Sequence, residues 1–162
     1  MENKIKQNRS QRKKSLKLIT NILIRTIDCA TGKIKETEEI HNAIVNSGLE
    51  RMARRIISNA NDFFDYIGIG TGVTGVQATD TTLETEVTRE QATVTYEANY
   101  KAKLEKIFTF SSGEAYDITE VGVLDDVTVS GSDLLNRATF TPKSVDSDTD
   151  LEIIVTITVA DA

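Results

Sequence analysis

Residues 92–110 alternate between apolar and polar side chains over a long stretch, and this alternation constrains the fold most. The segment reads ATVTYEANYKAKLEKIFTF, and its even positions are apolar from Val94 to Leu104 and again at Phe108. A period of two places alternate side chains on opposite faces of a strand. We therefore predict two strands here, or one long strand bent by a bulge over residues 103–106.

Further runs typical of strands lie on both sides of this segment, at residues 15–28, 34–46, 63–70, 116–124, 134–142 and 151–160. Their connections, such as SSGEA and DDVTVSGSD, are rich in turn residues. Short strands at regular spacing with few helices between them favour an antiparallel sandwich or barrel. The first two runs predict a hairpin that turns at Gly32, with Leu16, Leu18, Ile22 and Ile24 on one face of its first strand.

The segment SGLERMARRIISNAN predicts the one helix, over about residues 47–60. Ser47 and Glu50 have the spacing of a capping box, in which each side chain binds the backbone amide of the other residue. The apolar side chains follow helical spacing and form one stripe, at Leu49, Met52, Ala53, Ile56, Ile57 and Ala60. The predicted fold is mainly β, an antiparallel β-sandwich with one packed α-helix and an N-terminal basic arm.

Charge divides the chain into a basic arm, residues 1–17, and an acidic body, residues 18–162. The arm holds seven of the 19 basic side chains and one of the 25 acidic ones, whereas the whole chain has a net charge of −6. Such an arm is either a solvated tail, or a segment that docks on an acidic neighbour such as another copy, or a nucleic-acid contact. The acidic body and the lack of aromatic residues in the arm disfavour nucleic acid.

Eight basic side chains are candidate assembly contacts: Arg9, Arg12, Lys13, Lys14, Lys17, Arg51, Arg54 and Arg55. The first five belong to the arm. The last three lie off the apolar stripe of the predicted helix, so they form a solvated face or meet an acidic neighbour.

The segment GTGVTG, residues 70–75, matches the G-x-G-x-x-G pattern of dinucleotide-binding sites. That site needs a helix directly after the glycines, within a βαβ unit. The residues that follow, VQATDTTLETEV, have no apolar helical stripe, although Thr81 and Glu84 have the spacing of a short capped turn. We interpret the glycines at 68, 70, 72 and 75 as backbone geometry, namely a closely packed strand end and a loop with positive φ. Gly68, Gly70, Gly72 and Gly75 are therefore not predicted to hold a cofactor.

Other reactive residues are few. Cys29 and His41 are the only thiol and the only imidazole, so a nucleophile pair is conceivable, but no third group is placed to orient it. Zinc finds too few ligands. Residues 146–150, DSDTD, begin like a calcium loop but lack its later glycine and glutamate. We predict no enzyme activity, no metal and no cofactor.

The composition sets further limits. A single cysteine excludes an internal disulfide, and no window approaches the roughly 20 apolar residues of a membrane helix. The basic N-terminal residues lead into no long apolar stretch, so a signal peptide is not expected.

Four stretches resemble, in their order, small structural proteins of tailed bacteriophages, which are known as tail, tail-fibre or minor virion proteins. They are EIHNAIVNSGLERMARRI, YIGIGTGVTGVQATDTTLETEVTR, YDITEVGVLD, and LLNRATFTPKSV followed by LEIIVTITV. The similarity covers about residues 38–159 and does not include the basic arm. It implies a β-rich virion building block present in many copies, with no catalytic residues.

We therefore expect a non-enzymatic structural subunit of a tailed-phage virion, tail- or fibre-associated, made in the host cytoplasm. Its partners would be other virion proteins and copies of itself, with no membrane, small-molecule substrate or nucleic acid. One alternative is a capsid decoration (cement) or neck protein stapled by the basic arm. Another is a host-surface binding module that uses Tyr96, Tyr100 and Tyr116, although shared strand faces favour core or inter-subunit positions for these side chains.

Overall fold

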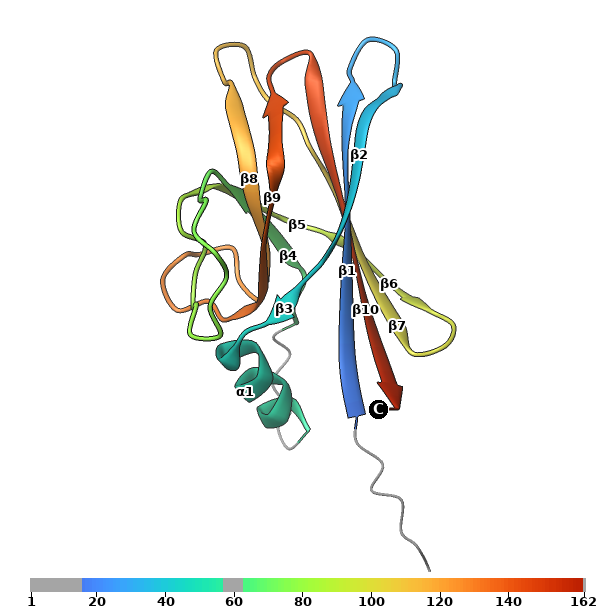
Figure 1. Ribbon diagram of the computed structural model, residues 1–162, viewed down its shortest axis with the longest axis vertical. Coiled ribbons are helices and arrows are strands. Elements are labelled where there is room, and N and C mark those ends of the chain that lie inside the picture. Colours follow the sequence, from blue (N-terminus) through green and yellow to red (C-terminus); the bar gives the residue numbers. More distant parts are fainter. Residues whose placement is uncertain (1–15, 57–62, 162) are drawn as a thin grey trace, which may run out of the picture.

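The part of the chain that the structure describes forms two antiparallel sheets with one short helix, in a sandwich-like arrangement (Figure 1). The computed structural model describes residues 16–56 and 63–161. The first sheet has the order β2-β1-β10-β7-β6, with β1 Leu16–Asp28, β2 Ile34–His41, β6 Thr93–Glu97, β7 Lys101–Phe108 and β10 Thr149–Asp161. The second has the order β3-β9-β8-β4-β5, with β3 Ala43–Ile44, β4 Tyr66–Gly70, β5 Glu86–Gln91, β8 Tyr116–Leu124 and β9 Leu134–Val145.

The alternation in β1 produces the predicted hairpin and part of the predicted core. Ile22 and Ile24 are fully buried, and Gly32 takes the positive φ of 66° that the turn requires. The core lies between the sheets and joins these side chains to others such as Phe108, Ile153 and Ile67. Near the first residue of β1, the side chains on this same face are no longer buried.

The predicted return strand, residues 34–46, is two strands in different sheets. β2 pairs with β1, whereas β3 pairs with β9. At the crossing the amide of Asn42 still donates to the carbonyl of Thr20, so the chain passes from one layer to the other without a long loop.

The helix α1 spans Asn46–Arg55, and residues 57–60 of the predicted helix lie outside the described residues. The predicted capping box is wrong. Val45 occupies the N-cap without a side-chain cap, and the Ser47 hydroxyl donates to the carbonyl of Leu134 instead. Gly48 is the buried residue of the helix, and it packs directly against the backbone of β9. A β-carbon at this position would lie only 2.7 Å from the Cα of Leu135, so the close approach requires glycine. Close approach to β9, and not a local cap, fixes the start of this helix.

Residues 92–110 form two strands, as in the first of the two predicted alternatives. β6 and β7 meet at a turn in which Asn99 and Tyr100 have positive φ of 65° and 63°. No register shift occurs over residues 103–106. The short helical turn predicted at Thr81–Glu84 is wrong, because residues 71–85 form a loop.

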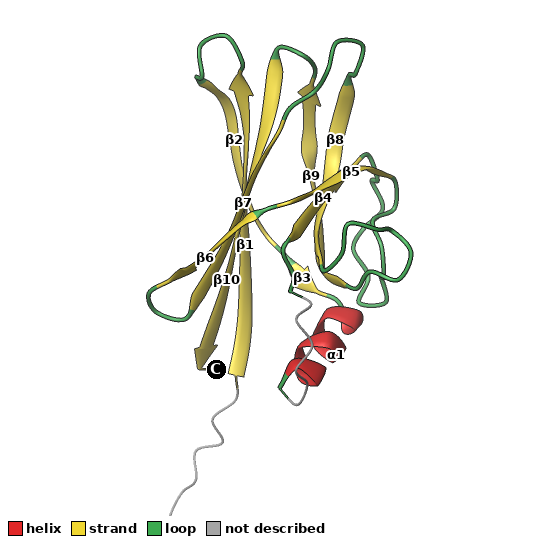
Figure 2. Cartoon of the chain, turned by 180° about the vertical axis from the view of Figure 1, so that it is seen from behind, coloured by secondary structure: helices red, strands yellow, loops and turns green. Residues whose placement is uncertain are grey.

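The two ends of the molecule differ (Figures 1 and 2). At the upper end lie three turns, which join β1 to β2, β7 to β8 and β9 to β10. At the lower end lie α1, the first residue of β1, the last residues of β10 and the β6–β7 turn. Residues 1–15 of the predicted arm lie outside the described residues, whereas Leu16 and Lys17 begin β1. The arm is therefore attached at the lower end.

Candidate functional site: a buried clamp and an open apolar groove

The glycine segment closes over a buried carboxylate. Glu120 of β8 is fully buried, and its Oε1 accepts hydrogen bonds from the amides of Gly72 at 3.0 Å and Thr85 at 2.7 Å. A β-carbon at Gly70 or Gly72 would lie 2.5 Å from this oxygen. Glycine at both positions therefore lets the backbone reach the carboxylate, as the close-packing interpretation predicted.

The positive φ predicted for this loop is wrong. Among the described glycines, only those at positions 32, 113 and 131 have positive φ. Gly68 is closely packed, since a β-carbon would lie 2.9 Å from Leu124 Cδ1, whereas Gly75 faces open space. Residues 71–85 form no helix, so the segment after Gly75 has no helix N-terminus for a pyrophosphate.

Arg137 of β9 completes the cluster around Glu120. Its Nε donates to Glu120 Oε2 at 2.8 Å, Nη1 pairs with Asp80 at 2.9 Å, and Nη2 reaches Glu84 at 3.3 Å. The Arg137 side chain is 2% exposed. A buried charge of this kind is stable only when it is paired and hydrogen-bonded, and here both conditions hold. We call Asp80, Glu84, Glu120 and Arg137 the buried clamp, after its buried pair of Glu120 and Arg137; the side chains of Asp80 and Glu84 are partly exposed.

The electrostatics of the clamp match this geometry. Burial raises the pKa of Asp80, but the amide of Gln77 and the guanidinium of Arg137 outweigh it and the pKa is lowered overall. The pKa of Glu84 is also lowered, chiefly by hydrogen bonds from the amide and hydroxyl of Thr74. Both carboxylates thus stay ionised, and neither is suited to donate a proton near neutral pH. The clamp holds the loop on the sheet.

A second buried pair fixes the loop between β8 and β9. Arg89 pairs with Glu86, and its Nη1 donates to the carbonyls of Asp126 at 3.1 Å and Thr128 at 3.0 Å. Four charged residues of the stretches that resemble the phage proteins, Asp80, Glu86, Arg89 and Glu120, therefore have structural partners inside the domain. Sequence reasoning did not pair them, because the partners in the clamp are up to 57 residues apart.

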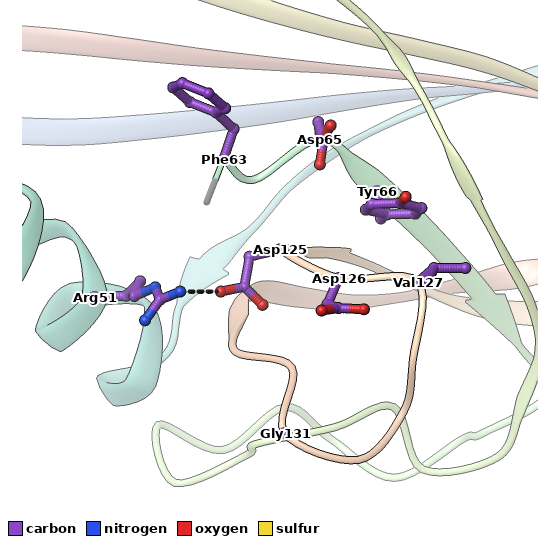
Figure 3. A pocket seen from close by; sticks show the side chains of 8 residues that line it. All are labelled: Arg51, Phe63, Asp65, Tyr66, Asp125, Asp126, Val127 and Gly131. Carbon is purple, nitrogen blue, oxygen red and sulfur yellow. Dashed lines mark ion pairs between the residues drawn. The ribbon is translucent and has the colours of Figure 1, made fainter. Parts of the chain in front are cut away.

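The pocket in Figure 3 lies beside α1 and is lined by polar side chains. Arg51 points into it and pairs with Asp125 at 2.9 Å and Asp133 at 3.5 Å. Asp65 and Asp126 lie farther along the same pocket. The described residues contain no group of three or more acidic, histidine or cysteine side chains arranged to hold a metal ion.

The three helix arginines predicted as assembly contacts all have partners within the chain. Arg51 binds the loop of Figure 3, Arg54 pairs with Glu50, and Arg55 lies 5.2 Å from the centre of the Phe63 ring. Of the arm contacts, Arg9, Arg12, Lys13 and Lys14 lie outside the described residues, and Lys17 is exposed at the start of β1. Whether these side chains serve in assembly stays a prediction.

The other residues with reactive groups do not converge. Cys29 lies in the β1–β2 turn, whereas His41 pairs with Asn21, seven residues along β1 from Asp28, a separation of about 23 Å at strand rise. Desolvation and the neighbouring Asp150 raise the pKa of the Cys29 thiol, which opposes thiolate formation. Residues 146–150 form a tight turn in which the amide of Asp148 donates to Asp146.

An apolar groove opens at the lower end, between the first sheet and α1. Six of its lining side chains come from five elements and the segment before β4: Leu18, Met52, Phe64, Tyr96, Leu104 and Ile157. Its volume is about 520 Å³. A second hollow beside it shares Leu18 and Met52 and adds Leu16 and Leu49. The two together are called the apolar groove below.

The rim of the groove exposes large side chains to solvent. Tyr96 and Tyr100 are each 73% exposed, and Leu16 is 78% exposed. Of the two expected positions for Tyr96 and Tyr100, the core is therefore wrong, whereas an inter-subunit contact stays a prediction. Tyr116 is half-buried and contacts Phe110. The cause is geometric, because the second sheet does not extend over the lower halves of β1, β7 and β10 (Figures 1 and 2).

In comparisons with known proteins, no family model, curated protein or solved structure matches the chain. Among the described residues, no helix has the length and apolar character needed to span a membrane.

Proposed function

We propose that this protein is a non-enzymatic structural subunit of a tailed-bacteriophage virion, tail- or fibre-associated, that acts by protein–protein assembly. The observation that carries the proposal is the apolar groove. Contiguous exposed apolar surface on a small protein is typical of an interaction site. Its lining of aromatic and aliphatic side chains, with exposed tyrosines at the rim, matches the composition of protein interfaces.

The buried clamp supports the same proposal. Its charged groups form ion pairs and hydrogen bonds with one another and with the loop backbone. They therefore favour a role in holding the loop in place over a role in chemistry. Three of the four stretches that resemble phage structural proteins contribute these groups. The resemblance and the geometry therefore both favour a structural role, in which copies and other virion proteins are the partners.

Copy number in purified particles tests this proposal. Mass spectrometry of gradient-purified phage should find the protein at a fixed stoichiometry relative to the major capsid protein. A few to a dozen copies would place it in a fibre, tip or neck, and hundreds would place it in the tail tube or on the capsid. Its absence from intact, infectious particles would contradict a virion role.

The position of the arm favours one alternative, a capsid decoration (cement) or neck protein. Residues 1–15 precede the rim of the groove, and about 15 extended residues reach up to roughly 50 Å. Deletion of residues 1–15 leaves β1 intact, so it isolates the arm. If the arm staples a neighbour, the deleted form should leave particles at moderate salt while the full chain stays bound. Equal retention of both forms would eliminate the stapling role.

A further inference from the structure

The apolar groove needs an occupant, and charge restricts which one. Lys17 and Lys101 lie at the groove without a recorded ion pair to a described residue, although Glu97 stands opposite Lys101 in the β6–β7 register. Residues 1–15, which join the chain at this rim, carry six further basic side chains and only Glu2 as an acid. The excess of positive charge at the lower end therefore comes mainly from the arm, although the whole chain has a net charge of −6.

A symmetric pairing of two grooves is disfavoured for this reason. In a two-fold interface the same patch of each copy meets its equivalent. Two basic rims and two basic arms would then come together, and like charges brought close repel one another. A complementary acidic surface is required instead.

The upper end of the same chain provides such a surface. Asp28, Asp146, Asp148 and Asp150 lie in or beside the β1–β2 and β9–β10 turns, and we call them the acidic tip. Lys35 neutralises Asp28 at 3.6 Å, which leaves the other three carboxylates in excess over Lys33. The tip also exposes small apolar side chains at Cys29 and Ala30, with Ile34 52% exposed beside them.

Backbone hydrogen bonds fix the shape of the tip. The amide of Gly32 donates to the carbonyl of Asp28, and the amide of Cys29 donates to the carbonyl of Asp148, which ties the two turns together. A preformed surface loses little conformational entropy on binding. It therefore suits insertion into a groove better than a flexible loop of the same composition.

From these observations we propose that the apolar groove binds the acidic tip of a second copy of this chain, so that copies associate head to tail. The small apolar side chains of the tip enter the groove, and its carboxylates pair with Lys101, Lys17 and the basic arm. The two surfaces lie at opposite ends of the molecule (Figure 1), so the contact is heterologous and generates a ring or a filament. This inference rests on the groove being the assembly surface in the proposed function, and it names the partner.

Purified full-length protein tests the proposal by sedimentation velocity over a range of concentrations, without phage particles. At about 50 mM salt the protein should self-associate, and at about 1 M salt, where the screening length is about 3 Å, association should weaken. Lys101→Glu and Asp148→Lys should each weaken it by about tenfold, because each turns an attraction into a repulsion. An equimolar mixture of the two variants should regain association, since the reversed groove then meets a reversed tip.

Matched variants separate charge from apolar contact. Glu39→Lys makes the same change in net charge as Asp148→Lys, but on the exposed face of β2, away from both ends, and should leave association unchanged. Tyr96→Ser removes apolar rim surface and should weaken association even at low salt. A chain that stays monomeric at all concentrations overturns the proposal. So does association that Asp148→Lys leaves unchanged, or that the mixture fails to restore. Neither result bears on whether the protein is present in particles.

Discussion

Replacement of Glu120 by glutamine tests the buried clamp most directly. The two carboxylate oxygens accept four hydrogen bonds, from the amides of Gly72, Glu84 and Thr85 and from Arg137 Nε, at 2.7 to 3.0 Å. Each oxygen serves two donors. Glutamine keeps the shape but presents an NH₂ group at one oxygen position, so two donors lose their acceptor in either orientation.

The size of the effect follows from this count. A hydrogen bond to a charged group contributes about 1.5–3 kcal/mol, and the loss of one partner of a buried ion pair costs about 3–5 kcal/mol. We therefore expect Glu120→Gln to lower the free energy of unfolding by about 3–5 kcal/mol. With an m-value of about 2 kcal/mol/M, the urea midpoint should fall by about 2 M. Amide hydrogen exchange should also accelerate in the 71–85 loop, since its anchors are lost.

Glu50→Gln is the matched control for this experiment. Glu50 pairs with Arg54 across one turn of α1 in an exposed position. Exposed pairs contribute little to stability, so the urea midpoint should not move beyond experimental error. If Glu120→Gln shifts the midpoint by less than about 0.5 M and leaves loop exchange unchanged, the clamp does not hold the loop and our reasoning about it is wrong.

Three further predictions concern backbone geometry and pH. Gly48→Ala should lower the free energy of unfolding by about 1–3 kcal/mol, because the added β-carbon would press on the Leu135 backbone. Gly75→Ala, in open space, should raise the free energy of unfolding by about 0.5 kcal/mol. Urea unfolding of both variants measures the two effects, and equal effects would contradict the packing argument. Tyr100→Asn should raise the thermal midpoint, because asparagine tolerates the positive φ of the β6–β7 turn better than tyrosine; a lower midpoint would show that the ring contributes more than the strain removes. Carboxylates with a lowered folded-state pKa, such as Glu84, stabilise the fold above their unfolded pKa, so stability should be flat from about pH 5 to 9 and fall below about pH 4.5, as acid titration followed by circular dichroism would show.

The sequence predicted the strands well because alternation is a local signal. Residues 16–28 and 116–124 needed only their own side chains to indicate a strand, and the β1–β2 hairpin needed only Gly32 in addition. Local signals misled where a distant group competed for the same atoms. The Ser47 hydroxyl matched a capping box, but the carbonyl of Leu134, 87 residues away, accepts its hydrogen bond.

The candidate sites were harder to predict for the same reason. Glu120 lies in the buried run of β8, between Ile118 and Val121, and this position could have indicated a buried charge. Nothing local identifies Arg137 and the loop amides as its partners. The groove escaped prediction because alternation indicates which face of β1 is apolar and not how far the opposing sheet extends. Leu16 and Ile22 therefore looked equivalent, although one is 78% exposed and the other fully buried.

The contrast between the two halves of β1 connects the fold to the proposed assembly. Its upper half is covered, and its partner β10 stays paired with it along all 13 residues. The lower half keeps the same regular pairing without a second sheet above it. The backbone hydrogen bonds of this extension contribute little net free energy, because they replace hydrogen bonds to water. Its apolar side chains contribute to stability only when they are removed from water. An extension of this kind is stabilised when another surface buries it, and in the proposed assembly the positive charge of the arm favours an acidic surface. The acidic tip satisfies this requirement within the same chain.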